Sequence, residues 1–595
     1  MVMAVVMVAV VAVVMVAVAE AALMMAVVAV DSCEDSKGVA SPAGGAAGPG
    51  APEAYARHRR LHSRQEELAA VENSTQSNGG RDLRRFAPTV PAATLAGSHS
   101  VPVLVRRDCS RNRSFVIPLL PAVPSLRCPG KGDRNFAACP GVHLIPVSTT
   151  KDGGGSKSRK RIMPDPVTEP PTVDPVYEAL LYCNIPSVAE HSMEGHAPHH
   201  YKLVSVHVFI RHGDRYPLYA IPKTKRPEID CTLVASRKPY HPKLEAFVSH
   251  MSKGLGASFE SPLNSLPLYP NHPLCEMGEL TQTGVVQHLQ NGQLLRDIYL
   301  RKHKLLPNNW SSEHLYLETT GKSRTLQSGL ALLYGFLPDF DWKKIYFKHQ
   351  PSALFCSGSC YCPLRNQYLE KEQRRQYLLR LKNNDLERTY GEMAKIVDIP
   401  TKQLRAANPI DSMLCHFCHN VSFPCSRGGC LGMEHFKVIK THQIEDERER
   451  HEKPLYFGYS LLGAHPILNQ TVNRMQRAAA GWTHELFTLY SAHDVTLSPV
   501  LSALGLLEAR FPRFAARLIF ELWQDRQKPS EHSVRILYNG ADVTFHTSFC
   551  HDFHKRSPKP MCPLENLVRF VKRDMFVALD GSSTNYYDAC HGQGA

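Results

Sequence analysis

The sequence of 595 residues contains no internal repeat. Charged residues make up only 21% of the chain and apolar residues 43%, so neither a fibrous nor a wholly disordered protein is expected. At this length the apolar fraction is sufficient for a large core and for more than one domain.

A concentrated basic region is also missing from most of the chain, although the formal net charge is +14. Residues 1–162 carry 20 Lys and Arg against 12 Asp and Glu, whereas the remaining residues carry 49 against 43. The surplus is therefore mostly a property of the N-terminal stretch. We predict no nucleic-acid partner from it.

Residues 1–30 contain no Lys or Arg and a single charge, Glu20. An apolar stretch of this length can span a bilayer as a helix, which favours a membrane anchor. The Ala-Val-Ala triplet at 17–19 also fits a signal-cleavage site, and a low-complexity stretch from a wrongly assembled first exon is the alternative. Residues 31–176 are rich in Pro, Gly and Arg without a sustained period, so we predict a linker.

Seventeen cysteines, thirteen of them after residue 162, are typical of a disulfide-bonded domain in a secretory lumen. Glycosylation sequons begin at Asn309, Asn420 and Asn469, with two more at Asn73 and Asn112. The Cys-His-Phe-Cys segment at 415–418 has the spacing of zinc ligands, but a lumenal compartment favours disulfides. The odd number of cysteines after residue 162 predicts that at least one thiol is free or pairs elsewhere.

From residue 177 to 595 short apolar runs alternate with helical patterns. We expect strands at 203–210, 315–319, 486–491, 516–524 and 533–539, and helices at 281–303, 323–336 and 495–506. This alternation is typical of an α/β fold with a largely parallel sheet flanked by helices. The charged, cysteine-rich segment at about 356–440 interrupts it and is predicted to form an inserted, mainly helical cap.

Polar residues follow the strand expected at 203–210, in the segment RHGDRYP. Ligands bind beyond the carboxyl ends of strands in open α/β sheets, and Arg211, His212 and Arg215 lie there. The arginines can present planar forks of donors to a phosphate or another oxyanion. His212 is a neutral nucleophile near pH 7.

Two later strand ends supply further groups for the same site. Arg324 follows the strand at 315–319, and His493 and Asp494 follow the strand at 486–491. Phosphoryl transfer requires cations for the nonbridging oxygens and an acid for the leaving alcohol. We therefore expect one pocket in which Asp494 is the acid and His493 is an additional phosphate donor.

Together with RHGDRYP, the segments GELTQTG (278–284), SRT (323–325) and SAHD (491–494) resemble the histidine acid phosphatase family, the second branch of the histidine phosphatase superfamily, in order and spacing. The resemblance runs from about residue 143 to the C-terminus. It implies a phosphoric monoester hydrolase in which His212 forms a phosphohistidine and Asp494 protonates the leaving oxygen. The phosphate would be held by Arg211, Arg215, Arg324 and His493. It also implies that no cofactor or metal is needed, because the arginines supply the positive charge.

The same resemblance implies a sugar substrate, the 2-O-phosphate of xylose in the glycosaminoglycan–protein linkage region of proteoglycans, whose removal promotes glycosaminoglycan synthesis. It implies the phosphorylated linkage glycan and a xylosyl-linkage glycosyltransferase as partners. The expected location is the Golgi membrane, with single-pass type II topology and a lumenal catalytic domain, or a secreted or lumenal form. A broad-specificity lumenal acid phosphatase, a phosphomutase and a catalytically silent protein that binds anionic glycans are the alternatives.

One position departs from the family pattern. Many members carry an arginine six residues before the position of Arg324, where this chain has Glu318. A carboxylate facing the pocket would repel phosphate. We therefore expect Glu318 to point away or to pair with a cation.

Overall fold

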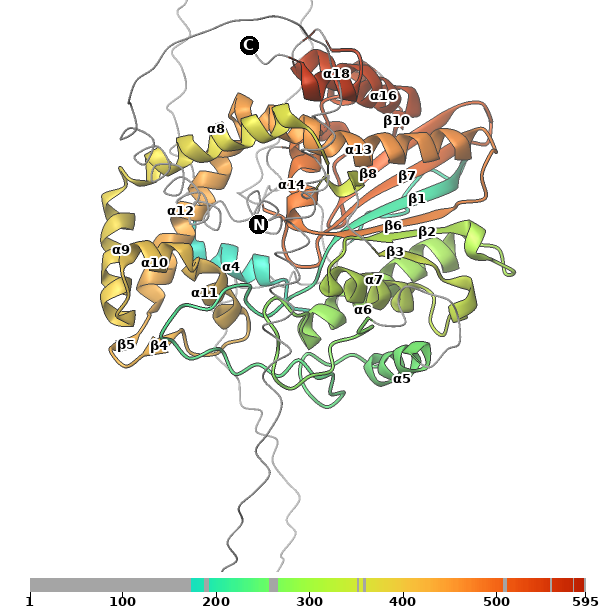
Figure 1. Ribbon diagram of the computed structural model, residues 1–595. Coiled ribbons are helices and arrows are strands. Elements are labelled where there is room, and N and C mark those ends of the chain that lie inside the picture. The colour runs from blue at the N-terminus through green and yellow to red at the C-terminus, as the bar shows by residue number, and fades with distance from the viewer. Residues whose placement is uncertain are drawn as a thin grey trace, which may run out of the picture. The chain divides into compact units, whose positions relative to one another are not determined.

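The computed structural model, shown in Figure 1, describes residues 173–186, 192–255, 266–349, 353–356, 360–506, 511–556, 559–579, 581 and 583–592. All of them belong to one compact unit. The predicted segment 1–30, nearly all of the predicted linker 31–176 and the sequons at Asn73 and Asn112 lie outside the described residues. Helix α4 (Pro175–Cys183) begins two residues before the predicted start of the catalytic domain, with Asp174 as its N-cap.

The core of the fold is an eight-stranded sheet in the order β10-β8-β7-β1-β6-β2-β3, with β9 beside β8. The strands are β1 (Tyr201–Arg211), β2 (Leu315–Thr319), β3 (Phe347–His349), β6 (Phe487–Ala492), β7 (Arg517–Asp525), β8 (His532–Tyr538), β9 (Ala541–Asp542) and β10 (Cys562–Pro563). Strands β1, β6, β2 and β3 run parallel, and β7 to β10 extend the sheet with antiparallel pairs. The predicted α/β class is confirmed. The parallel part is confined to four strands, because β7 runs antiparallel to β1, and the short connection from β7 to β8 then permits only a hairpin.

Helices cover both faces of this sheet, as Figure 1 shows. On one face, Val206, Val208 and Ile210 of β1 share a core with α6 (Gln282–Leu295) and α7 (Ser323–Phe336). On the other face, Phe209 of β1 shares a core with α13 (Pro454–Ala479) and α14 (Asp494–Ala503). Strand β1 is therefore buried on both sides, as its continuous apolar run predicts.

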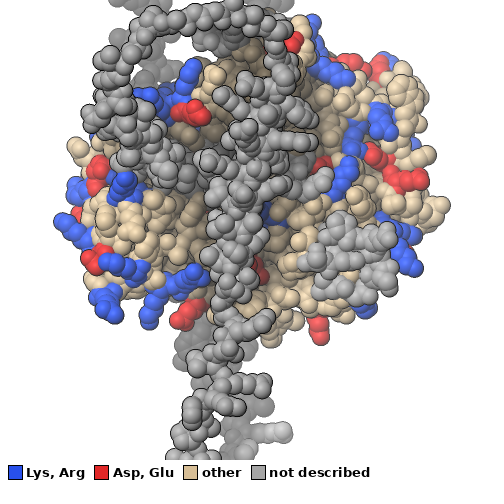
Figure 2. All heavy atoms as spheres, in the orientation of Figure 1, with Lys and Arg blue, Asp and Glu red and all other residues tan. Residues whose placement is uncertain are grey.

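The remaining helices lie around this framework. Helix α6 continues as a π-helix over Arg296–Lys302. Further α- and π-helices of this part are α5 (Leu244–Leu255), α15 (His551–Arg556), α16 (Leu564–Arg569), the π-helix Phe570–Asp574, α17 (Met575–Leu579) and α18 (Tyr586–His591). Short 3-10 helices span Ser312–His314, Trp342–Lys344, Ala353–Phe355 and Thr544–His546. Figure 2 shows basic side chains interspersed with acidic and uncharged ones over the described surface of one face.

The segment predicted as a cap contains mostly helices. It holds α8 (Pro363–Arg380), α9 (Asn384–Val397), α10 (Thr401–Ala406), α11 (Pro409–Cys418), the hairpin of β4 (Cys425–Ser426) and β5 (Gly429–Cys430), and the start of α12 (Met433–His451). These helices share a third core with α4, in which Tyr182, Met393, Ile410 and Phe436 are buried. That the cap segment is a separate domain stays a prediction. Helix α12 continues eleven residues beyond the predicted boundary at 440.

All thirteen cysteines after residue 162 are described, and twelve form disulfides. The pairs are Cys183–Cys418, Cys231–Cys275, Cys356–Cys360, Cys362–Cys590, Cys425–Cys430 and Cys550–Cys562. Cys415 is free and buried, which accounts for the odd number. Because Cys418 is bonded to Cys183, the zinc interpretation of residues 415–418 is wrong. Within the described ranges, the helices are all too short or too polar to cross a bilayer.

Candidate active site

The predicted site residues converge where three parallel strands end side by side. Arg211, the last residue of β1, pairs with Ala492 of β6, and Thr319, the last residue of β2, pairs with Ser491 of β6. The chain segments that follow these strands therefore meet at one edge of the sheet. They carry all six predicted catalytic and phosphate-binding residues, each of them at most 6% exposed: Arg211, His212, Arg215, Arg324, His493 and Asp494.

His212 is fixed by its backbone and by one ring nitrogen. Its N–H donates to the carbonyl of Ala492 (3.0 Å), and its own carbonyl accepts from the N–H of Ala515 (3.1 Å). Its Nδ1 lies 2.8 Å from the carbonyl oxygen of Gly213. A carbonyl can only accept, so Nδ1 carries the proton and Nε2 keeps its lone pair. Burial lowers the pKa of His212 well below its usual value, and the nearby Arg324 and Arg211 lower it further.

The loop after β1 lies against the start of α6, which explains the GELTQTG segment. A Cβ atom on Gly213 would lie 2.5 Å from the backbone of Gly284, and one on Gly284 would lie 2.4 Å from the carbonyl of Asp214. Thr281 is the N-cap of α6 and also bonds to the carboxylate of Asp214. Two glycines thus allow a backbone contact that places His212.

Arg211 is completely buried and surrounded by partners. Its guanidinium donates to the hydroxyl of Tyr182 and to the carbonyl of Pro512, both at 2.8 Å, and pairs with Asp494 at 2.6 Å. The guanidinium carbon also lies 4.9 Å from the ring centre of Tyr182 and 4.4 Å from that of Phe514. Tyr182 and Phe514 come from segments distant along the chain, and no local pattern indicated them.

The other two arginines differ in their neighbours. Arg215 forms a 2.7 Å ion pair with Asp411 of α11, a residue that sequence reasoning missed. Arg324, the second residue of α7, has no carboxylate partner among the described residues. Burial, followed by the nearby Arg215, lowers the pKa of Arg324 to about 9. Arg324 is therefore a buried cation whose guanidinium can bind an anion.

His493 and Asp494 begin α14. His493 is its N-cap, and its Nε2 lies 2.9 Å from the hydroxyl oxygen of Thr320, while its ring centre lies 5.4 Å from that of His212. Burial, and then Arg324, lower the pKa of His493 well below the usual value. Burial raises the pKa of Asp494, and Arg211 and Arg215 oppose this only in part. The carboxyl group of Asp494 therefore holds its proton above the usual range, as a general acid must.

Lys322 is a further cation that the sequence analysis did not single out. It is the N-cap of α7, two residues before Arg324, and is half-buried. Burial and Arg324 lower the pKa of its amine, and Lys322 in turn lowers the pKa of His493. Lys322 has no carboxylate partner within the described ranges, so its amine is available to an anion. The Gly-Lys-Ser sequence before Arg324 was the signal that could have identified it.

Glu318 is buried in β2 and is engaged by a tyrosine. Its carboxylate accepts from the hydroxyl of Tyr316, which itself accepts from the amine of Lys348 at 3.1 Å. The expectation was that Glu318 points away from the pocket or pairs with a cation; its direct partner is Tyr316, and the cation Lys348 is one hydrogen bond further away. Glu318 thus has a partner other than the phosphate-binding groups.

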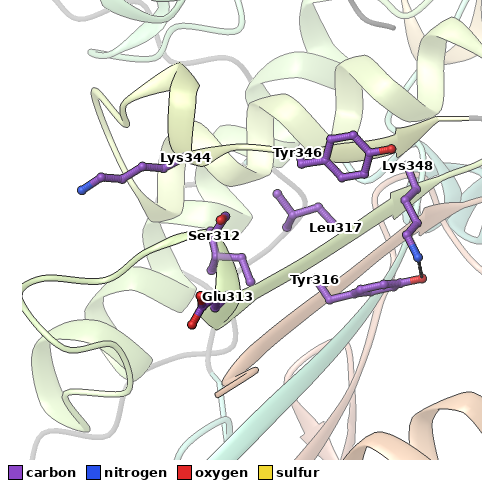
Figure 3. A pocket seen from close by; sticks show the side chains of 8 residues that line it. Ser312, Glu313, Tyr316, Leu317, Lys344, Tyr346 and Lys348 are labelled. Atoms are coloured by element: carbon purple, nitrogen blue, oxygen red, sulfur yellow. Dashed lines mark hydrogen bonds between the residues drawn. The ribbon is translucent and has the colours of Figure 1, made fainter. Parts of the chain in front are cut away.

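A separate cavity of about 340 Å³ lies near the amino ends of β2 and β3. Figure 3 shows Ser312, Glu313, Tyr316, Lys344, Tyr346 and Lys348 around it. The predicted catalytic residues do not line this cavity, since they follow the opposite ends of the strands. This cavity is therefore distinct from the buried cluster of predicted site residues.

Residues 202–539 match the family model of the histidine phosphatase superfamily (branch 2). The chain belongs to this superfamily, which confirms the resemblance, and it is a phosphomonoesterase. It is 96% identical over 453 residues to 2-phosphoxylose phosphatase 1 of Rattus norvegicus, across 76% of this chain and 94% of the relative. The identity to 2-phosphoxylose phosphatase 1 is 90% over 452 residues in Homo sapiens, with the same coverage, and 51% over 475 residues in Danio rerio, also with the same coverage.

Among solved structures, the phytase from D. castellii matches with 16% identity and a TM-score of 0.42, over 70% of this chain and 88% of the phytase.

Proposed function

We propose that this protein removes the 2-O-phosphate from xylose in the glycosaminoglycan–protein linkage region of proteoglycans, through a phosphohistidine at His212. The observation that carries the chemistry is the 2.8 Å contact between Nδ1 of His212 and the carbonyl of Gly213, which leaves Nε2 as the nucleophile. The substrate is supported by the names of relatives that are 51–96% identical. Removal of this phosphate would promote glycosaminoglycan synthesis.

In the first step, Nε2 of His212 forms a bond to phosphorus while the bond from phosphorus to the sugar oxygen breaks. The carboxyl proton of Asp494 passes to that oxygen, so the sugar leaves as an alcohol. Arg211, Arg215 and Arg324, with His493, bind the nonbridging oxygens, where negative charge must be stabilised.

In the second step, water attacks the phosphorus of the phosphohistidine. The carboxylate of Asp494 takes a proton from this water, and the bond from nitrogen to phosphorus breaks with its electron pair returning to Nε2 of His212. Inorganic phosphate leaves, and both residues return to their starting protonation states.

We also propose a Golgi location with the catalytic domain in the lumen. Six disulfides support an oxidising compartment. Asn309 and Asn420 are exposed, as glycosylation requires, whereas Asn469 is only partly exposed in α13. Anchoring through residues 1–30, and association with a xylosyl-linkage glycosyltransferase, are parts of this proposal that cell fractionation and co-purification would test.

The decisive experiment measures phosphate release from the phosphorylated linkage glycan and from a generic aryl phosphate, with wild type beside His212→Ala. We expect rapid release from the glycan, slower release from the aryl ester and none from the variant. Comparable release from both substrates would point instead to a broad acid phosphatase. No release from either substrate would favour the glycan-binding alternative.

A further inference from the structure

The cap segment reaches the phosphate site through the side chain of Asp411. One of its carboxylate oxygens lies 2.7 Å from Nη2 of Arg215, and the other accepts from the backbone N–H of Leu218 at 2.6 Å. Both side chains of the ion pair are about 95% buried. Both oxygens of Asp411 are therefore used by one short loop, which begins at the phosphate-binding end of β1.

This contact fixes the orientation of the arginine. Nη1 of Arg215 donates to the carbonyl of Tyr216 at 3.1 Å, so each terminal nitrogen has one protein partner. The Nε of Arg215 is buried without a partner among the described residues. Because a guanidinium is planar, fixing two of its donors also fixes the directions of the others. The remaining donors are free for an oxyanion.

Helix α11 is itself held against this loop at its other end. Its last residue, Cys418, is bonded to Cys183, and the next residue, His419, lies 2.6 Å from the carboxylate of Asp214. The helix that carries Asp411 is thus attached at both ends to the segment between His212 and Leu218.

We propose that Asp411 is a positioning residue: through its two carboxylate oxygens, helix α11 orients the guanidinium of Arg215 toward the phosphoryl group during transfer. The inference rests on the proposed function, because Arg215 must bind the phosphate. A contribution to stability alone is a weak explanation, since a buried ion pair adds little over well-packed apolar residues.

The variant Asp411→Asn tests this role because the two donors bond to different oxygens of Asp411, and an amide would turn an NH2 group, itself a donor, toward either Arg215 or Leu218. Arg215 keeps its charge and still attracts the phosphate dianion, but it loses its orientation. We expect kcat/KM to fall by about tenfold or more, with most of the loss in kcat rather than in KM. The loss should be equal for the glycan and an aryl phosphate, because the contact concerns only the phosphate.

The matched control is Asp398→Asn. Asp398 pairs with Lys223 and so also joins the cap segment to the rest of the fold, but both side chains are exposed. We expect kcat/KM to stay within about twofold in this variant. Equal losses in the two variants would mean that general attachment of the cap segment matters, and would overturn the role of Asp411.

Two further variants separate the possible failures. Asp411→Glu keeps the buried charge pair and so favours folding, but it moves the carboxylate by one methylene; unchanged kcat/KM in this folded variant would refute the inference. Arg215→Gln and the double variant that combines it with Asp411→Asn should have the same kcat if Asp411 acts only through Arg215. If Arg215→Gln itself left turnover intact, the proposed phosphate site would be wrong. If only Asp411 proved dispensable, the proposed function would stand.

Discussion

Replacement of Asp494 by Asn should separate the two steps of the reaction according to the leaving group. Asn has the shape of Asp and can still accept from the N–H of Val495, which bonds to Oδ1 at 3.0 Å, but it cannot transfer a proton. A sugar oxygen is a poor leaving group without that proton, whereas an aryl oxygen leaves readily as an anion. A positioned general acid contributes about 10²- to 10⁴-fold, or roughly 3–5 kcal/mol of transition-state stabilisation.

The assay is single-turnover formation of the phosphohistidine from xylose 2-phosphate glycan and from an aryl phosphate. For Asp494→Asn we expect the glycan rate to fall about 10²- to 10⁴-fold and the aryl rate by less than about tenfold. The phosphohistidine should then accumulate with the aryl ester, because the variant also lacks a base for water. The affinity for substrate should not weaken, since the change removes a negative charge 2.6 Å from Arg211.

In the wild type, the raised pKa of Asp494 places the fall of glycan turnover on the alkaline side of the usual carboxyl range, because the acid must carry its proton to react. The lowered pKa of His212 keeps the nucleophile neutral on the acidic side. Single-turnover rates that fall by the same factor for both esters in Asp494→Asn would refute the role of Asp494 as the acid for the leaving group.

Three other changes have expected outcomes. Lys322→Gln should raise KM for phosphate esters by about three- to tenfold. The control Lys344→Gln, at an exposed lysine beside the separate cavity, should leave KM unchanged. Equal KM values for the two variants would remove Lys322 from the site. Burial lowers the pKa of His419, but the ion pair with Asp214 outweighs this and raises it. The contribution of this ion pair to stability is therefore present at acidic pH and is lost as the pH rises through the pKa of His419. His419→Gln should lower the urea midpoint more at pH 5 than at pH 9, and an equal change at both pH values would contradict this. Gly213→Ala should reduce kcat strongly while the protein stays folded, because the added Cβ would displace the loop from the backbone of Gly284, and a fully active variant would show that the contact is not needed.

The sequence was most informative where a motif follows a strand directly. The apolar runs at 315–319 and 323–336 have the same bounds as β2 and α7, since both are buried and both begin or end at clear polar residues. Arg324, His493 and Asp494 could be assigned to one edge because parallel neighbouring strands end together. The position of each group along the chain was sufficient for this prediction.

The partners of these groups could not be predicted from local pattern. Tyr182 lies 29 residues before Arg211, and Asp411 lies 196 residues after Arg215, so no periodicity links either pair. Helix α12 continues past the predicted end of the cap segment at 440, which local pattern does not indicate because α12 has charged residues on most sides. One of its buried charges, Asp446, pairs with Arg380 of α8, and a hydrophobic pattern does not reveal such a contact.

The ion pairs observed in the site are consistent with the proposed order of the proton transfers at Asp494. Arg215 is paired with Asp411, and Arg211 with Asp494, while Arg324 and Lys322 have no carboxylate partner among the described residues. In the proposed mechanism, protonation of Asp494 would release Arg211 to bind a nonbridging oxygen of the incoming dianion.

After the proton passes to the leaving sugar, the new carboxylate can pair again with Arg211 at the observed 2.6 Å. In the proposed first step, the negative charge that appears on Asp494 is balanced by the positive charge that the imidazole of His212 gains when Nε2 bonds to phosphorus, because Nδ1 keeps its proton. The net charge of the site would therefore stay constant through the proposed first step, so we expect no rearrangement of the protein to stabilise the phosphohistidine.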